Sequence, residues 1–327
     1  MKKIYRVYAM FSGGLDSILS VIYMKKLGYE VIPIFFKTPF FTPENAQKAA
    51  DENGFELTVI DITKQHIEMM KAPRYGFGKN MNPCIDCHGL MFRELSKLME
   101  ENKIDFLISG EILGQRPMSQ RKDALNSVAK LSSVKDLIIR PLCQKLLVDT
   151  KPIREGWVKK EEMLDIQGRG RYRQIALAKE YGIKSFSNPG GGCVLTDIQY
   201  SIKLKDLVEH NMFEEKYIKF LRIGRHFRLS DNVKMIIGRN SDDNEKLSKL
   251  ITDEIIFKHL EIPGPLAIIN SKHKLQKNEI ELVASLLLRY HQKIENEAIV
   301  HFGENHKLEN SIQVTKMPRE EVKKYQL

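Results

Sequence analysis

The amino-acid sequence predicts an α/β protein, with a doubly wound parallel sheet and a second, smaller α+β domain. In roughly the first 205 residues, short apolar runs alternate with helical stretches, which is the rhythm of βαβ units. These runs are apolar throughout, as in strands that are buried on both faces of a sheet. After about residue 211 the apolar runs come closer together, and one strong helix interrupts them.

The chain length and composition indicate a globular protein. At 327 residues we expect about two domains of ~150 residues each, and we place them at 1–205 and 206–327. A hydrophobic content of 42% with 29% charged residues excludes a largely disordered or collagen-like chain. No apolar run approaches the ~20 residues that span a bilayer, and the start lacks a signal-peptide pattern. We therefore expect a cytoplasmic protein without membrane contact.

The expected elements follow from the apolar pattern. In the first part we expect strands at 7–11, 31–36, 57–60, 106–109 and 137–142, and helices that include 16–27 and 92–101. In the second part we expect strands at 233–237, 255–259, 266–269, 298–302 and 312–316. A helix is expected at about 279–291, because Ile280, Val283, Ala284 and Leu287 have the spacing of one helical face.

The charge balance and the cysteines narrow the classes of function. The chain has 52 Lys and Arg residues against 42 Asp and Glu residues, a formal charge of +10. This excess is compatible with an anionic partner such as nucleic acid, but does not by itself select one. Four cysteines in an intracellular chain are not a disulfide framework, so they indicate metal binding, catalysis or burial.

The sharpest motif is Ser12-Gly13-Gly14-Leu15-Asp16-Ser17, between the first expected strand and the first expected helix. Two glycines let the backbone approach an anion, and the free N–H groups of a helix start point at it. Ser12 and Ser17 add hydroxyl donors, and Asp16 can hold Mg²⁺, which prefers oxygen ligands. The motif is neither a Walker loop nor a dinucleotide fingerprint. A tight turn with Asp16 as a helix cap is the alternative.

In this context the motif resembles the SGGxDS signature of the PP-loop ATP pyrophosphatases, a family with a doubly wound domain of the HUP or Rossmann-like type. Members of that family split ATP between its α and β phosphates to adenylate a substrate. The resemblance implies an ATP site in the crevice at the carboxyl ends of the strands. The residues that it implies are Ser12, Gly13, Gly14, Asp16 and Ser17 for the pyrophosphate, and Phe35 and Phe36 for the adenine.

Three cysteines indicate further chemistry. Cys84 and Cys87 form a C-x-x-C that His88 follows, and Cys193 comes after the glycines at 190–192. The residues alone leave four interpretations: haem attachment, a structural zinc site that includes His88, a redox pair, or sulfur chemistry through persulfides or an iron–sulfur cluster. Haem attachment requires export, for which the start of the chain gives no signal. Cys143, at the end of an expected strand, is expected to be buried.

The segment 82–92 resembles the N-P-C-x-x-C segment of the bacterial tRNA-specific 2-thiouridylases. A C-x-x-C with a lone cysteine far downstream also resembles the cluster-dependent tRNA thiolases, or thiouridine synthetases. The resemblance implies that Cys84, Cys87 and Cys193 hold a [4Fe–4S] cluster with one open iron, and that they act with Asp16 in catalysis. A persulfide on Cys193 without a cluster is the alternative. The segment around Cys193 differs from that of the 2-thiouridylases, so the target nucleoside is left open.

Two further segments are expected near the site. Residues 110–119 follow the fourth strand and should face the ligand crevice, where Gly110 and Arg116 would contact ATP and Glu111 would lie near Mg²⁺. A solvated loop is the alternative. Residues 168–173, Gly-Arg-Gly-Arg-Tyr-Arg, are basic and carry an aromatic ring, so they could contact RNA phosphates and stack a base. A charged helix start is the alternative there.

The C-terminal part resembles the NFACT-R type of RNA-binding domain. The resemblance rests on a strand that runs into Gly238-Arg239-Asn240, on Asn244, on the segment 263–265, and on the helix that follows. It implies phosphate contacts from basic side chains, namely Arg222, Arg225, His226, Arg228 and Arg239. A dimerisation domain is the alternative, which makes a homodimer one expected state.

Together these observations predict an ATP-dependent tRNA sulfurtransferase. It would bind ATP, Mg²⁺ and a [4Fe–4S] cluster, and it would take sulfur from sulfide or from a persulfide carrier. The first rival is a PP-loop amidating ligase that uses ammonia and needs no cysteines. The second rival is an RNA-binding protein that carries a structural zinc and has ATP as a ligand.

Overall fold

The chain folds into two compact units, Met1–Asp197 and Ile198–Leu327. The computed structural model describes residues 3–183, 186 and 193–327. The boundary expected from the sequence, between residues 205 and 206, falls within helix α8 (Ile198–Glu209). Within the described ranges, no helix is long and apolar enough to cross a membrane.

The first unit is built on a parallel sheet, which confirms the expected fold class. Its strands are β1 (Arg6–Met10), β2 (Glu30–Lys37), β3 (Thr58–Asp61), β4 (Phe106–Ser109) and β5 (Ile138–Ile139). They pair in the order β3-β2-β1-β4-β5, all in parallel. The order reverses at β1 and β4, so the carboxyl ends of these two strands form the switch point where doubly wound sheets bind ligands.

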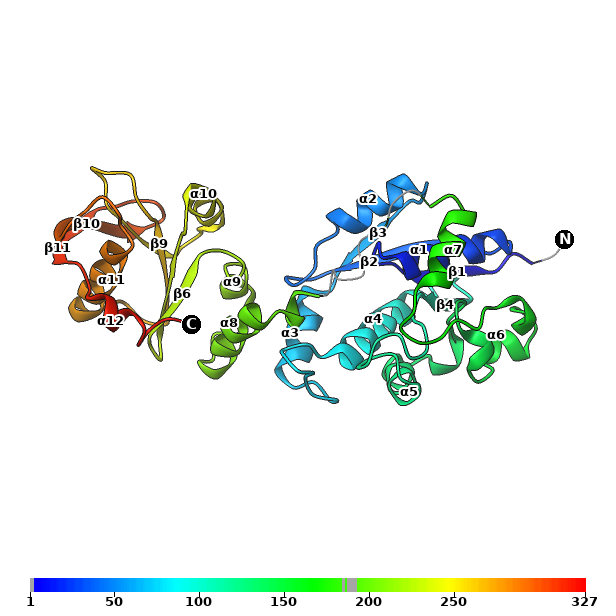
Figure 1. Cartoon of the computed structure of the whole chain (residues 1–327). Helices are drawn as coiled ribbons and strands as arrows, with labels where there is room; N and C mark the ends of the chain where they lie inside the picture. Colours follow the sequence, from blue (N-terminus) through cyan, green and yellow to red (C-terminus); the bar gives the residue numbers. More distant parts are fainter. Residues whose placement is uncertain (1–2, 184–185, 187–192) are drawn as a thin grey trace. The chain divides into compact units, whose positions relative to one another are not determined.

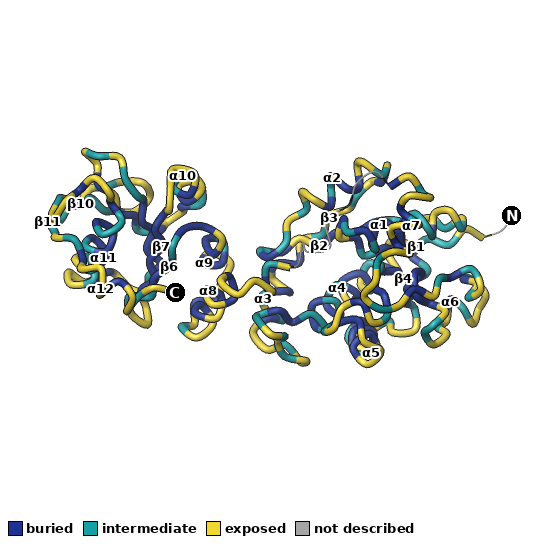
Figure 2. The backbone as a smooth tube through the Cα atoms, viewed as in Figure 1, coloured by how far each residue is buried: buried dark blue, intermediate teal, exposed yellow. Residues whose placement is uncertain are grey.

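Helices cover both faces of this sheet (Figure 1). They are α1 (Leu15–Lys26), α2 (Glu44–Glu52), α3 (Thr63–Lys71), α4 (Cys84–Leu98), α5 (Lys122–Leu131), α6 (Lys151–Arg154) and α7 (Tyr172–Glu180), with 3-10 turns at 135–137, 144–146, 160–162 and 194–196. In β1, Val7 and Ala9 pack in the core with α1, α2 and α7, whereas Tyr8 packs with α4 and α5. The central strands β1 and β4 are therefore covered on both faces, which explains their continuous apolar runs, whereas the edge strand β3 is largely exposed. The buried strands appear dark blue in Figure 2.

Helix α4 begins earlier than the sequence pattern suggested. We expected helix at 92–101, but α4 spans Cys84–Leu98 and carries the C-x-x-C in its first turn. Asp86, in that turn, accepts hydrogen bonds from the backbone N–H groups of Arg74 and Tyr75 at 2.8 and 2.9 Å. These contacts hold the preceding segment against the helix start, and they depend on tertiary structure that the apolar pattern does not reveal.

The fifth strand is shorter than the expected run of 137–142. Only Ile138 and Ile139 pair with β4. The backbone N–H of Arg140 donates instead to the side chain of Gln144 at 2.9 Å, and the N–H of Cys143 donates to the carbonyl of Arg140. The chain therefore turns at Arg140, because a local side-chain acceptor replaces the neighbouring strand.

The second unit contains a six-stranded antiparallel sheet in the order β11-β10-β8-β9-β7-β6. Its strands are β6 (Arg225–Ser230), β7 (Val233–Ile237), β8 (Ile255–Lys258), β9 (Ala267–Ser271), β10 (Glu297–Glu304) and β11 (Asn310–Thr315). Besides α8, its helices are α9 (Glu215–Ile218), α10 (Ser241–Leu250), α11 (Lys277–Arg289) and α12 (Arg319–Val322). The apolar face of α11 packs on one side of the sheet, and Leu247 of α10 packs on the other. All five expected strands form, and β6 is an additional strand.

A buried ion pair fixes the loop that follows β4. Glu111 accepts a hydrogen bond from Arg140 Nε at 2.8 Å and another from His88 Nδ1 at 2.8 Å. Burial opposes ionisation of Glu111, but the charge of Arg140 and the contact with His88 outweigh it and lower the pKa of Glu111 to about 2. This carboxylate therefore ties the ends of β4 and β5 to the first turns of α4.

A second buried carboxylate joins α8 to the antiparallel sheet. Asp206 on α8 accepts two hydrogen bonds from Arg228 on β6, at 2.9 and 2.7 Å, and one from Lys234 on β7 at 2.5 Å. Lys234 is fully buried, and burial lowers its pKa to about 8 although Asp206 acts in the opposite direction. The expected phosphate contact of Arg228 is thus replaced by an internal one.

Replacing Glu111 should remove pH-dependent stability from the first unit. The folded pKa is about 2 and the ordinary value is 4.5, so the stabilisation is complete above pH 4.5 and is lost as the pH falls from there toward 2. We expect Glu111→Gln to lower the free energy of unfolding by about 3 kcal/mol at pH 7, with a difference from wild type that narrows below pH 4.5. Urea unfolding followed by the fluorescence of Trp157, the only tryptophan, measures this. The control is Glu68→Gln, which removes an exposed pair with Lys71. A loss equal to that of the control would contradict the assignment.

Replacing Asp206 should destabilise the second unit selectively. Asp206→Asn leaves the buried Lys234 without a counter-charge, so we expect a loss of about 3–5 kcal/mol. Circular dichroism should show this loss in urea, while the transition of Trp157 in the first unit stays in place. Glu209→Gln, which removes an exposed pair with Lys205 on the same helix, should change stability by less than about 0.5 kcal/mol. Equal effects of the two substitutions would refute the buried-pair account.

Candidate functional site

The motif at residues 12–17, called the phosphate loop below, connects β1 to α1, as expected. Its backbone conformation requires glycine at residue 13. Gly13 has a φ of +72°, and a Cβ there would lie 2.8 Å from the Cα of Ala46 on α2. Ser17 Oγ donates to the carbonyl of Gly14 at 2.8 Å, and the N–H of Gly14 donates to Ser12 Oγ at 3.4 Å. The two serines that we expected to bind phosphate therefore also hold the turn in shape.

The loop after β4 lies directly on the phosphate loop. A Cβ at Gly110 would lie 2.5 Å from the backbone C and O of Asp16 and 2.6 Å from the N of Ser17. Only glycine permits so close an approach of two chain segments. The carboxyl ends of β1 and β4 thus meet at the switch point, where we expected both loops.

Asp16 lies in a polar cluster with Gln115 and Arg171, which belong to the two segments expected near the site but were not expected to contact Asp16. Its Oδ2 accepts hydrogen bonds from Gln115 Nε2 at 2.5 Å and from Arg171 Nη2 at 3.2 Å. Its Oδ1 is buried and has no hydrogen-bond partner. An unpaired carboxylate oxygen beside a phosphate loop suits a divalent cation such as Mg²⁺, which takes oxygen ligands.

The C-x-x-C segment is held by contacts on either side. Asn82 Nδ2 lies 3.3 Å from Cys84 Sγ and 3.4 Å from the sulfur of Met118. Cys87 is buried, and its Sγ lies 3.4 Å from Nε2 of the fully buried His66. Burial lowers the pKa of His66 to about 4, so this imidazole is neutral at neutral pH. His66 was not anticipated, since it lies in α3, 21 residues before Cys87, without a motif of its own.

The three cysteines that we expected to act together lie in one electrostatic environment. Burial, followed by the charges of Cys193 and Cys84, raises the pKa of the Cys87 thiol well above its usual range. Cys193 is exposed, and its carbonyl accepts hydrogen bonds from Thr196. The glycines at 190–192 lie outside the described residues. Among the residues that the structure describes, no group of three His, Cys, Asp or Glu side chains could hold a metal ion.

Helix α4, which carries Cys84 and Cys87 and is called the cysteine helix below, is linked to the phosphate loop through the loop after β4. His88, next to Cys87, pairs with Glu111, and the neighbouring Gly110 lies against the backbone of Asp16. Glu111, which we expected near Mg²⁺, is instead fully engaged with His88, Arg140 and Ser109. The arrangement places sulfur-bearing side chains and an anion-binding loop on adjoining segments of one unit.

The other expected site residues have different surroundings. Phe35 and Phe36 are both buried, one in each of the two cores of the sheet, at 6% and 4% exposure. Arg116 is exposed. Cys143 is fully buried, as expected, and burial raises its pKa to about 11.

In the second unit, the structure changes our view of the basic side chains. His226 is 1% exposed, so its expected phosphate contact is wrong. Arg228 pairs with Asp206. Arg239 pairs with Asp243 at 2.6 Å but keeps half of its side chain exposed, and Arg225 lies over the ring of Tyr290 at 5.0 Å. Of these four, Arg225 and Arg239 are the ones still placed to meet an anion.

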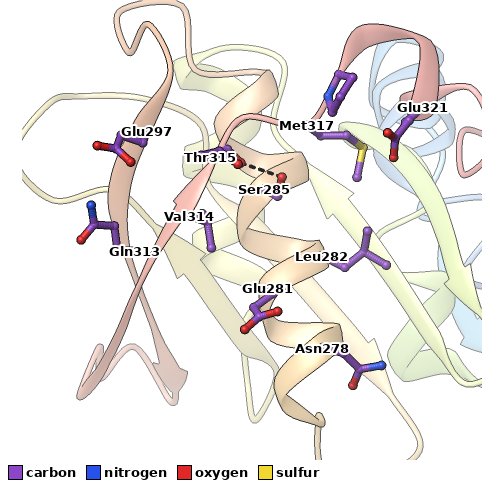
Figure 3. Close-up of a pocket in the computed structure, with 11 residues that line it drawn as sticks. Asn278, Glu281, Leu282, Ser285, Glu297, Gln313, Val314, Thr315, Met317 and Glu321 are labelled. Atoms are coloured by element: carbon purple, nitrogen blue, oxygen red, sulfur yellow. Dashed lines mark hydrogen bonds between the residues drawn. The ribbon is translucent and has the colours of Figure 1, made fainter.

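The second unit also has a pocket of about 750 Å³ between α11 and β11 (Figure 3). Ser285 donates to the carbonyl of Thr315 across it, at 2.7 Å. Three carboxylates line the pocket, those of Glu281, Glu297 and Glu321. Like charges repel, so this pocket is unsuited to a phosphate group.

Comparison with known proteins assigns both parts of the chain. Residues 4–149 match the family model "Thiamine biosynthesis protein (ThiI)", and residues 224–326 match that of the "NFACT protein RNA binding domain". The tRNA-specific 2-thiouridylase MnmA of Sulfurimonas denitrificans is 34% identical over 118 residues, which are 33% of this chain and 35% of that protein. A probable tRNA sulfurtransferase of Thermococcus kodakarensis is 28% identical over 143 residues, which are 42% of this chain and 36% of that protein.

A solved structure of a 4-thiouridine synthetase–RNA complex with bound ATP is also similar. The two chains are 20% identical, and the match covers 64% of this chain and 53% of the other, with a TM-score of 0.38. The chain spans about a third of the length of the curated relatives that it matches. The first model covers the strands of the parallel sheet, and the second covers those of the antiparallel sheet. The chain therefore carries a ThiI-like PP-loop domain followed by an NFACT-type RNA-binding domain.

Proposed function

We propose that this protein is an ATP-dependent tRNA sulfurtransferase. The observation that carries the proposal is the linkage of the phosphate loop to the cysteine helix through Gly110, Glu111 and His88. An amidating ligase would need the phosphate loop alone, and a zinc-containing binding protein would need the cysteines alone. The curated relatives that match the first unit are named as 2-thiouridylases and a sulfurtransferase, which supports the same choice.

The reaction has two steps. A carbonyl oxygen of a tRNA base attacks the α-phosphate of ATP, and pyrophosphate leaves. A sulfur nucleophile then attacks the carbon that bears this oxygen, and AMP leaves with the oxygen. In the first step, the N–H groups of residues 12–17 and a cation on Asp16 would stabilise the charge that develops on the phosphates. The second unit would hold the tRNA, with Arg225 and Arg239 among its phosphate contacts.

We further propose that Cys84, Cys87 and Cys193 handle the sulfur by holding a [4Fe–4S] cluster. Cysteine thiolates hold clusters of this kind, so these three side chains would hold it, and the cluster would supply iron for sulfur chemistry. After burial, Cys193 and Cys84 both contribute to the raised pKa of the Cys87 thiol, which supports a shared role. The side chains as positioned do not form a three-donor group, so no step is assigned to the cluster. A persulfide on Cys193 is the alternative form of the same chemistry.

Asp16→Ala should abolish adenylation without disturbing the cysteines. The substitution removes the carboxylate that would hold Mg²⁺, so we expect tRNA-dependent pyrophosphate release to fall at least about a hundredfold. Pyrophosphate should be measured with ATP and unmodified tRNA, and iron content should be measured in parallel and should not change. Asp165→Asn is the control, because Asp165 is an exposed carboxylate paired with Arg173. Wild-type turnover by the Asp16 variant would remove Asp16 from the mechanism.

Cys193→Ala should abolish thiolation while ATP binding persists. We expect about four irons with labile sulfide per chain in protein purified without oxygen, and a loss of both in this variant. Mass spectrometry of nucleosides from treated tRNA measures the thiolation. Cys143→Ala is the matched control, because Cys143 has no partner motif and its fully buried thiol donates to the carbonyl of Glu111, so it should be dispensable. Thiolation without iron would favour the persulfide form, whereas zinc without thiolation would favour the RNA-binding rival.

A further inference from the structure

The basic segment 168–173 separates into residues that face solvent and one that turns inward. Tyr172 is 76% exposed, and Arg173 pairs with Asp165 on the surface. Arg171 instead reaches the phosphate loop, where its Nη2 lies 3.2 Å from Asp16 Oδ2. Both side chains of this pair are only 15% exposed. A solvated helix start or a purely RNA-facing loop does not account for this placement.

Several contacts hold Arg171 in this position. The N–H of Gly168 donates to the carbonyl of Leu113 at 2.8 Å, which fastens the segment to the loop after β4. Gln174, fully buried in the first turn of α7, donates to Gln115 Oε1 at 2.9 Å. Gln115 in turn donates to Asp16. The guanidinium is therefore built into the site by the same loop that supports the phosphate loop.

The polar cluster around Asp16 contains an unpaired hydrogen-bond acceptor and an unpaired donor. Asp16 Oδ1 and Arg171 Nη1 are buried, and neither has a hydrogen-bond partner. Leaving such buried groups unpaired is unfavourable, and more so when they are charged. The carboxylate oxygen lacks a cation or a donor, and the guanidinium N–H lacks an acceptor. A ligand that brings an anion together with a cation would satisfy both.

The phosphate loop itself carries no positive side chain. From residue 12 to residue 24 the sequence has no lysine or arginine, and the loop offers only N–H groups and hydroxyls. A triphosphate carries several negative charges, and in other phosphate loops a lysine supplies part of the compensation. A guanidinium suits this task, because its planar fork matches phosphate oxygens.

We propose that Arg171 is the phosphate-binding cation of the ATP site and exchanges partners when the nucleotide binds. Without nucleotide it neutralises Asp16. When ATP and Mg²⁺ enter, Asp16 takes the metal and Arg171 moves to the phosphate chain. This inference rests on the proposed ATP site. It assigns Arg171 to the nucleotide, and leaves Arg169, Tyr172 and Arg173 to face the RNA.

The test is nucleotide binding by the full chain, measured by calorimetry with ATP and Mg²⁺ and separately with adenosine. We expect Arg171→Ala to weaken ATP binding by about ten- to a hundredfold, the value of a charged hydrogen bond, and to leave adenosine binding unchanged. Arg171→Lys should recover part of the loss, because it keeps the charge but not the fork. Lys179→Ala, an exposed cation on the same helix α7, should change neither affinity.

The outcomes separate this inference from the proposed function. Equal loss of ATP and adenosine binding in Arg171→Ala would show that Arg171 has only a structural role. Unchanged ATP binding would show that Arg171 has no role in binding the phosphates. Either result overturns the inference. If the alanine variant does not fold, Arg171→Gln, which can still hydrogen-bond to Asp16, takes its place with the same expected loss. Failure of the wild-type protein to bind ATP would instead overturn the ATP site itself.

Discussion

The loop that follows β4 can lie on the phosphate loop only because residue 110 has no side chain. Any Cβ there would meet the backbone of Asp16 and Ser17 at about 2.5 Å, a distance that no packing adjustment accommodates. The two loops belong to the strands at which the sheet order reverses, so this approach closes the switch point into a single site. The adjoining residues then follow, because Glu111 reaches His88 on the cysteine helix and Gln115 reaches Asp16.

Buried carboxylates serve two different purposes in this protein. In the first, Glu111 is fully paired and holds structural elements together, since its pKa is driven low by Arg140 and His88. Asp206 does the same in the second unit, with Arg228 and Lys234. Asp16 differs, because one of its oxygens lacks a partner and its cation, Arg171, is unsatisfied as well. A paired buried carboxylate indicates architecture, whereas an incompletely paired one at a switch point indicates a place for a ligand.

The structure leaves fewer basic side chains in a position to meet an anionic partner than the composition suggests. Arg228, which we expected to meet RNA, is engaged by Asp206 inside the unit, and His226 is buried. The pocket beside α11 is lined by carboxylates. A formal charge of +10 therefore says little about where an anionic partner lies. The exposed cations Arg169, Arg173 and Arg239 and the partly exposed Arg225 are better guides.

The sequence alone determined the fold class, the expected strands of both units and the place of the phosphate loop between a strand and a helix. These features are local: apolar runs predict buried strands, and Ser-Gly-Gly-x-Asp-Ser between a strand and a helix has few other uses. It did not place the start of α4 or the early end of β5, because Asp86 and Gln144 act through contacts formed only in the folded chain. The partners of the site residues, His66 beside Cys87 and Arg171 beside Asp16, lie 21 and 155 residues away in the sequence. Only the tertiary structure decided these, because a side chain's partners depend on which segments the sheet order brings together, and no local pattern records that.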